Sequence, residues 1–198
     1  KYHGGNLEEW MAVRGKALRL IAASKPDHHF VKTHCQTMRV GDYDLIPPDV
    51  TAAAIYIMRN PLDMVLSYAR HYAMSHEEAV ERITHPDNAN LPTETSVADF
   101  LGTWESHVRS WVKYAPWPRL VLRYEDLLDD PETHFAKVLD LIGVPVDQER
   151  LRRAIRFSSF DELSKQEEES GFIEKPKESE KFFGKGKKDQ WKTDLAPE

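Results

Sequence analysis

Apolar residues recur at helical spacing in several parts of the chain, and short apolar runs lie between them. The periodicity predicts helices over 7–23, 61–73, 97–114, 130–141, 147–156 and 159–168. The short apolar runs predict strands over 28–33, 51–58 and 120–124. Strands that alternate with long helices favour an α/β fold in which helices flank a parallel central sheet.

The remaining segments lack this periodicity. Residues 42–49 contain two prolines and predict a loop, and residues 170–190 predict irregular structure. Residues 74–96 are polar, and they are too long for a simple connector, so we expect a surface excursion or lid there. The sequence has no internal repeat, and its 198 residues suit a single domain.

The junction after the strand at 51–58 is the most informative local pattern. The strand ends at Arg59, Asn60 is a good helix N-cap, and Pro61 suits the first helical position. A helix N-terminus beside a fixed arginine can hold a phosphate, and Ser67 lies one to two turns further along. This junction therefore predicts a phosphate site.

All three predicted strands end in polar residues. These are Lys32-Thr33-His34, Arg59-Asn60 and Arg123-Tyr124-Glu125-Asp126. Ligands of open α/β sheets bind outside the carboxyl ends of the strands, so these residues are expected to converge on one site.

Composition narrows the choice of ligand. The formal net charge of −6 argues against a nucleic-acid binder. Residues 181–192 nevertheless hold five lysines and a single aspartate, which favours a small anionic ligand. No apolar run approaches the ~20 residues needed to span a bilayer. The single cysteine, Cys35, excludes an internal disulfide and suits a reducing compartment, so we expect a cytoplasmic protein.

Five blocks of the sequence, in order, resemble motifs of the cytosolic-type sulfotransferases. They are Val31-Lys32-Thr33-His34, Met58 to Asp63 with Ser67-Tyr68, Arg123-Tyr124-Glu125-Asp126-Leu127, Ser158-Ser159-Phe160, and Lys185-Gly186 through Trp191-Lys192. The resemblance covers about residues 30–195, and the last block is most similar to some bacterial members.

The resemblance implies a fold and a reaction. The fold would be a three-layer, P-loop-NTPase-like α/β architecture. The reaction would move a sulfuryl group from 3′-phosphoadenosine 5′-phosphosulfate to a hydroxyl or amine of a small-molecule acceptor. Direct in-line transfer is expected, without a metal or a covalent enzyme intermediate, and the product of the donor would be adenosine 3′,5′-bisphosphate. Family members are often monomers or homodimers.

The resemblance also assigns roles to individual residues. His34 matches the general base, and Lys32 would help to organise the site. Arg59 and Ser67 match contacts to the 3′-phosphate, and Tyr124 matches a contact to the adenine edge. The remaining matches line the adenine (Ser158 and Phe160) or close over the 3′-phosphate (Lys185 and Gly186).

The chain departs from the family pattern in three ways. The family's loop for the 5′-phosphosulfate is absent, and only 33 residues precede His34, so we expect a domain that is incomplete at its N-terminus. Residues 195–198 read as the start of a helix, which suggests that the C-terminus is incomplete too. Gly184 stands where the family usually has arginine, so Lys187 or Lys188 could supply that charge. Asp189-Gln190 replaces Gly-Asp.

Two other function classes stay open. A degenerate sulfotransferase fold could serve as a binding module, as the missing loop and Gly184 would allow. A nucleotide kinase would need a Walker A loop and an acidic Mg²⁺ ligand, and neither is visible. The acceptor is not determined: residues 74–96 are expected to shape its pocket, and helical spacing favours core positions for Trp104 and Trp111.

Overall fold

The computed structural model describes residues 7–92, 97–175, 179 and 181–195. The chain divides into two compact units. The first comprises Lys1–Ala54 and Ile83–Arg119, and the second comprises Ile55–Arg82 and Leu120–Glu198.

The first unit is built on a long helix and two small hairpins. Helix α1, Leu7–Ala23, forms over the predicted range, and Gly15 does not interrupt it. Strands β1, Arg39–Val40, and β2, Tyr43–Asp44, pair antiparallel, as do β4, Ala89–Asn90, and β5, Asp99–Phe100. The core of this unit gathers around three buried side chains, those of Met11, Cys35 and Leu45.

The strand predicted over 28–33 is wrong, because the structure has no regular element there. Phe30 and Val31, which suggested a buried strand, are exposed. The backbone that follows is held by single contacts instead of a ladder. Cys35 N–H donates to the Thr33 hydroxyl at 3.2 Å, and Gln36 N–H donates to the Phe100 carbonyl at 2.9 Å.

The helix predicted over 97–114 begins later than expected. Residues 99–100 form β5, Gly102 has a φ of +62°, and Thr103 caps helix α4, Trp104–Arg109. The helix continues as a π-helical turn, Ser110–Tyr114. Trp111 is buried in this turn, which confirms the core position that its spacing predicts.

The predicted excursion at 74–96 contains a helix that the sequence analysis missed. Helix α3, His76–Thr84, begins with a capping box: Ser75 N–H donates to the Glu78 carboxylate at 2.8 Å, and Glu78 N–H donates to the Ser75 hydroxyl at 3.1 Å. Ala79 is fully buried on this helix. The excursion is therefore partly regular and packed, and its residues 93–96 lie outside the described part.

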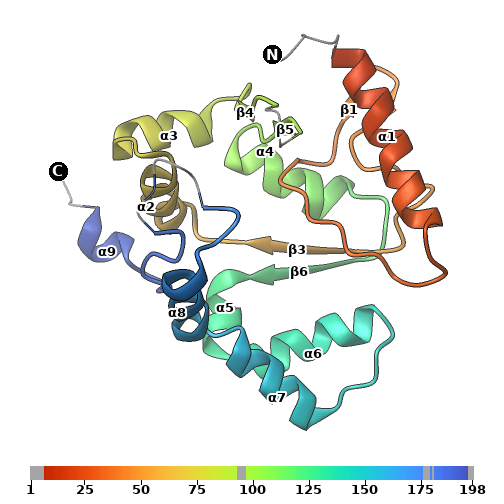
Figure 1. Ribbon diagram of the computed structural model, residues 1–198. Coiled ribbons are helices and arrows are strands. Elements are labelled where there is room, and N and C mark those ends of the chain that lie inside the picture. The colour runs from red at the N-terminus through yellow and green to blue at the C-terminus, as the bar shows by residue number, and fades with distance from the viewer. Residues whose placement is uncertain (1–6, 93–96, 176–178, 180, 196–198) are drawn as a thin grey trace. The chain divides into compact units, whose positions relative to one another are not determined.

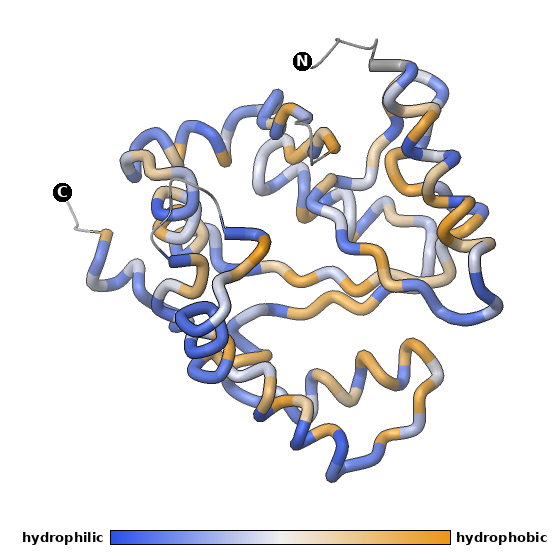
Figure 2. The backbone as a smooth tube through the Cα atoms, in the orientation of Figure 1, coloured by the Kyte–Doolittle hydropathy of each residue, from blue (hydrophilic) through white to orange (hydrophobic). Residues whose placement is uncertain are grey.

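The second unit contains the paired strands β3, Ala54–Met58, and β6, Arg119–Arg123, apart from the first residue of each. The two strands run parallel (Figure 1). Figure 2 shows that both are mainly hydrophobic. Helix α2, Pro61–Tyr72, follows β3, and helix α5, Tyr124–Asp129, follows β6. A parallel sheet with flanking helices confirms the predicted α/β class.

Three further helices of this unit begin at caps that the sequence contains. They are α6, Pro131–Leu141, capped by Asp130; α7, Gln148–Phe157, capped by Asp147; and α8, Phe160–Ser170, capped by Ser159. The short helix α9, Trp191–Asp194, closes the described chain, and residues 196–198 lie outside it. No helix among the described residues is long and apolar enough to cross a membrane.

Candidate functional site

Arg59 is fixed at the point where β3 meets α2. Its Nη1 donates to the Ser67 hydroxyl at 2.6 Å, and its Nη2 donates to the Lys187 carbonyl at 3.0 Å. Asn60 caps α2 by accepting Leu62 N–H at 2.9 Å, as predicted. The Arg59 guanidinium therefore joins Ser67 on α2 to Lys187 in residues 181–192, the lysine-rich segment.

Tyr124 completes this arrangement from the end of β6. The Arg59 guanidinium carbon lies 4.7 Å from the centre of the Tyr124 ring, a cation–π distance. The Arg59 Nε is buried and has no hydrogen-bond partner among the described residues. Three predicted site residues, Arg59, Ser67 and Tyr124, thus lie in direct contact, and one buried donor of the guanidinium is left over.

A buried glutamate joins the two strand ends. Glu125 is 8% exposed and accepts Asn60 N–H at 2.7 Å. The sequence resemblance includes Glu125 in a motif and implies no role for it. Its place between a strand end and a helix start shows what it does: it holds the Arg59-Asn60 corner against the start of α5.

A buried aspartate ties the lysine-rich segment to α2. Asp63 is only 1% exposed and accepts Asp189 N–H at 2.7 Å and Trp191 N–H at 3.0 Å. Asp189 has a φ of +60°, a conformation that glycine adopts more easily. Asp189, which stands where the family has glycine, can keep this left-handed conformation, because aspartate tolerates it better than most other residues do.

Gly186 and Phe160 form a second contact between predicted site residues. Gly186 has a φ of +60°, and a Cβ placed on it would lie 2.2 Å from the Phe160 ring. Lys185, its neighbour, is exposed and pairs with Asp194 at 2.6 Å. Ser158 is exposed at the end of α7, where its hydroxyl donates to the Ala154 carbonyl.

A third buried carboxylate, which the sequence did not lead us to expect, holds the segment before Gly184. Glu167 on α8 is 8% exposed and accepts Phe182 N–H at 2.6 Å and Phe183 N–H at 2.9 Å. Burial opposes ionisation of this carboxyl, but the two N–H groups together with the charges of Lys175 and Lys181 lower the pKa of Glu167.

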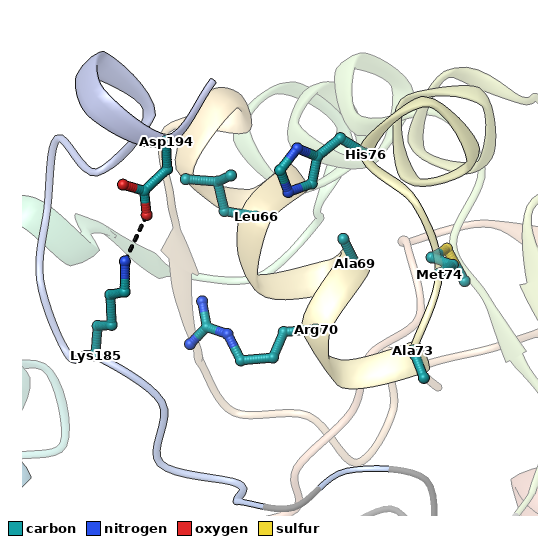
Figure 3. Close-up of a pocket in the computed structure, with 8 residues that line it drawn as sticks. All are labelled: Leu66, Ala69, Arg70, Ala73, Met74, His76, Lys185 and Asp194. Carbon is teal, nitrogen blue, oxygen red and sulfur yellow. Dashed lines mark hydrogen bonds and ion pairs between the residues drawn. The ribbon is translucent and has the colours of Figure 1, made fainter. Parts of the chain in front are cut away.

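A pocket of about 420 Å³ opens beside α2 in this second unit (Figure 3). Its charged lining is Arg70, Lys185 and Asp194, with His76 also present. The rest of the lining is Leu66, Ala69, Ala73 and Met74. Figure 3 shows the Arg70 side chain turned toward the Lys185–Asp194 pair.

His34 lies in the first unit, on a segment that is held at both sides. Thr33 accepts from the Arg14 guanidinium at 3.3 Å, and the Cys35 side chain is completely buried. His34 itself is exposed, as is Lys32. The neighbours face inward and fix the backbone, so the His34 imidazole is presented outward.

His107 adds a second histidine to this segment. Its Nε2 lies 3.0 Å from the His34 carbonyl oxygen, a hydrogen bond in which the neutral or charged ring donates. Burial lowers the pKa of His107 and outweighs this hydrogen bond, which acts in the opposite direction. His107 therefore favours the neutral form and serves as a fixed support for the His34 backbone.

The comparisons with known proteins identify the family. The sulfotransferase domain family matches residues 13–198, so the chain belongs to it. Sulfotransferase 1A1 of Bos taurus is 31% identical over 122 residues, which cover 59% of this chain and 39% of the relative. Sulfotransferase 2A1 of Rattus norvegicus is 26% identical over 153 residues, covering 76% and 48%. The chain spans about half the length of such relatives or less.

Solved structures show the same fold. A retinol dehydratase in complex with androsterone and the inactive cofactor PAP has a TM-score of 0.62 at 23% identity, covering 94% of this chain and 55% of that one. The mouse sulfotransferase SULT7A1 complexed with PAP has a TM-score of 0.55 at 22% identity, covering 74% and 53%. These likenesses confirm the P-loop-like α/β fold that the sequence resemblance implies.

Proposed function

We propose that this chain belongs to a sulfotransferase that moves a sulfuryl group from 3′-phosphoadenosine 5′-phosphosulfate to a hydroxyl or amine of a small-molecule acceptor. The observation that carries the proposal is the setting of Arg59. Its guanidinium is held by Ser67, by the Lys187 carbonyl and by the Tyr124 ring, yet its buried Nε has no partner among the described residues. Such a guanidinium is preorganised for a phosphate.

The residues present fit this donor. Arg59 and Ser67 would hold the 3′-phosphate, with Lys185 and the backbone at Gly186 closing over it. Tyr124, Ser158 and Phe160 would line the adenine, and Phe160 already packs against Gly186. The solved relatives named above were complexed with PAP, which supports the same ligand class for this chain.

The acceptor side is proposed to depend on His34. When bound, the donor would supply an activated sulfuryl group, whose bond to the 5′-phosphate oxygen breaks and releases adenosine 3′,5′-bisphosphate. The His34 imidazole would take the proton from the acceptor hydroxyl as the new S–O bond forms, and Lys32 would help to organise this end. The exposure of His34 on a fixed backbone supports its role as general base, because such a base must be both accessible to the acceptor and held in position.

The acceptor class is a small molecule. One solved relative binds androsterone and another structure of retinol dehydratase contains retinol, so apolar alcohols are the first acceptors to test. We propose a cytoplasmic monomer or homodimer that works without a metal.

The test is sulfuryl transfer by the full-length protein to a panel of phenols and alcohols. We expect His34→Ala to lower kcat by at least a hundredfold, within the ~10²–10⁴-fold that a general base supplies, and to leave the affinity for adenosine 3′,5′-bisphosphate unchanged. His28→Ala is the matched control, because His28 is exposed on the same segment. Near-normal turnover after His34→Ala would overturn the assignment of the base.

A further inference from the structure

Arg70 lies one helical turn beyond Ser67 on α2, on the same face. Arg59 precedes α2 and donates to the Ser67 hydroxyl at 2.6 Å, so Ser67 stands between Arg59 and Arg70 along this side of the helix. The segment 184–187 lies along the same side. Its Lys187 carbonyl meets Arg59 at 3.0 Å, and Gly184 meets Arg70.

The contact between Gly184 and Arg70 is close. A Cβ built on Gly184 would lie 1.6 Å from the Arg70 Nη1 and 2.8 Å from its guanidinium carbon. No side chain fits at position 184 while Arg70 keeps this position. The guanidinium therefore occupies the volume in which a side chain from position 184 would begin.

The Arg70 guanidinium also faces the pocket beside α2, together with Lys185 (Figure 3). Asp194 is the anion that now meets these cations, since it pairs with Lys185 at 2.6 Å. Lys185 lowers the pKa of Asp194, and the charge of Arg70 adds to this effect. Arg70 and Lys185 thus line one open pocket, with Lys185 paired to the Asp194 carboxylate, and two such cations can accept a phosphate group.

Lys187 and Lys188, which could have supplied the positive charge that Gly184 lacks, have other contacts. Lys188 forms an ion pair with Asp129 on α5. Lys187 contributes its backbone carbonyl to Arg59. Arg70 is thus the cation that the structure sets against Gly184.

We infer that Arg70 is a specificity-determining residue that binds the 3′-phosphate of the donor together with Arg59 and Ser67, and that Gly184 is small because the Arg70 guanidinium takes its place. This inference rests on the proposed function, since it assigns one more contact to the same ligand.

The experiment compares adenosine 3′,5′-bisphosphate with adenosine 5′-phosphate by calorimetric titration of the full-length protein. The ratio of the two dissociation constants measures recognition of the 3′-phosphate alone. Arg70→Ala should reduce this ratio by about tenfold to a hundredfold, as loss of a hydrogen bond between charged groups does. The affinity for adenosine 5′-phosphate and the thermal unfolding midpoint should not change. Arg153→Ala, an exposed arginine on α7, removes the same charge and should keep the ratio.

Two further variants test the pairing with Gly184. Gly184→Ala should lower the ratio with Arg70 intact, because the new methyl group displaces the flexible end of Arg70. The double variant Arg70→Ala with Gly184→Arg places a guanidinium in this region from position 184. Its ratio of dissociation constants should be at least tenfold higher than that of Arg70→Ala alone. Failure to recover would overturn the pairing.

The outcomes separate the two proposals. A wild-type protein that binds both nucleotides equally would refute the donor assignment itself. A wild-type preference for the 3′-phosphate that survives Arg70→Ala would refute the role of Arg70 and leave the donor assignment standing.

Discussion

Asp63 is expected to be the residue on which the position of the lysine-rich segment most depends. Its carboxylate is buried and accepts two backbone N–H groups, from Asp189 and Trp191. A hydrogen bond to a charged group contributes about 1.5–3 kcal/mol, so the pair contributes about 3–6 kcal/mol to holding the segment. Asp63→Ala removes both bonds, whereas Asp63→Asn keeps one acceptor oxygen and sets an NH₂ group against the other N–H.

Amide hydrogen exchange measures the contribution of these hydrogen bonds to local stability. We expect exchange at Asp189 and Trp191 to accelerate by about a hundredfold or more in Asp63→Ala and about tenfold in Asp63→Asn, since 1.4 kcal/mol is a factor of ten. Amides of α6 should be unaffected. Asp161→Ala is the matched control, an exposed aspartate in the first turn of α8. Unchanged protection at both amides in Asp63→Ala would refute the reasoning.

Two further predictions concern the same unit. Gly186→Ala should destabilise the fold by about 1–3 kcal/mol through its left-handed φ and should also weaken binding of adenosine 3′,5′-bisphosphate, because the methyl group meets Phe160. Gly143→Ala has a similar φ in open space, so equal effects of both variants on binding would contradict this. Glu167 should stabilise the protein fully above its unfolded pKa of about 4.3 and lose this effect as pH falls through its lowered native pKa. The free energies of unfolding of wild type and Glu167→Gln, measured in urea, should therefore become equal at low pH. A difference between them that grows as the pH falls would contradict the assignment.

The α/β class and the strand–helix junction could be predicted because their signals are local. Asn60, Asp130, Asp147 and Ser159 all cap the helices that they precede, and each signal lies within four residues of sequence. The capping box at Ser75 is equally local, so α3 could have been predicted and was missed.

The buried carboxylates could not be predicted from local pattern. Asp63 bonds to residues more than 120 positions away, and Glu125 bonds to a residue 65 positions away. An acidic residue in a first helical turn usually faces water, so nothing local distinguishes these two from exposed ones. The partnership of Arg70 with Gly184 is hidden for the same reason.

The strand predicted over 28–33 failed because an apolar run does not by itself specify burial. Phe30 is 71% exposed, whereas Thr33, at the end of this segment, accepts from Arg14, and Cys35, two residues further on, is buried. The predicted roles of all the site residues stay predictions, since they concern bound ligands: His34, Lys32, Arg59, Ser67, Tyr124, Ser158, Phe160, Lys185 and Gly186.

The central claim is that Arg59 recognises a 3′-phosphorylated adenine nucleotide. The direct measurement is a calorimetric titration of adenosine 3′,5′-bisphosphate, with ADP as the comparison, on wild type and Arg59→Ala. We expect wild type to prefer the 3′-phosphorylated nucleotide and Arg59→Ala to lose about tenfold to a hundredfold of that preference. Equal binding of the two nucleotides by wild type, or a preference untouched by Arg59→Ala, would contradict it.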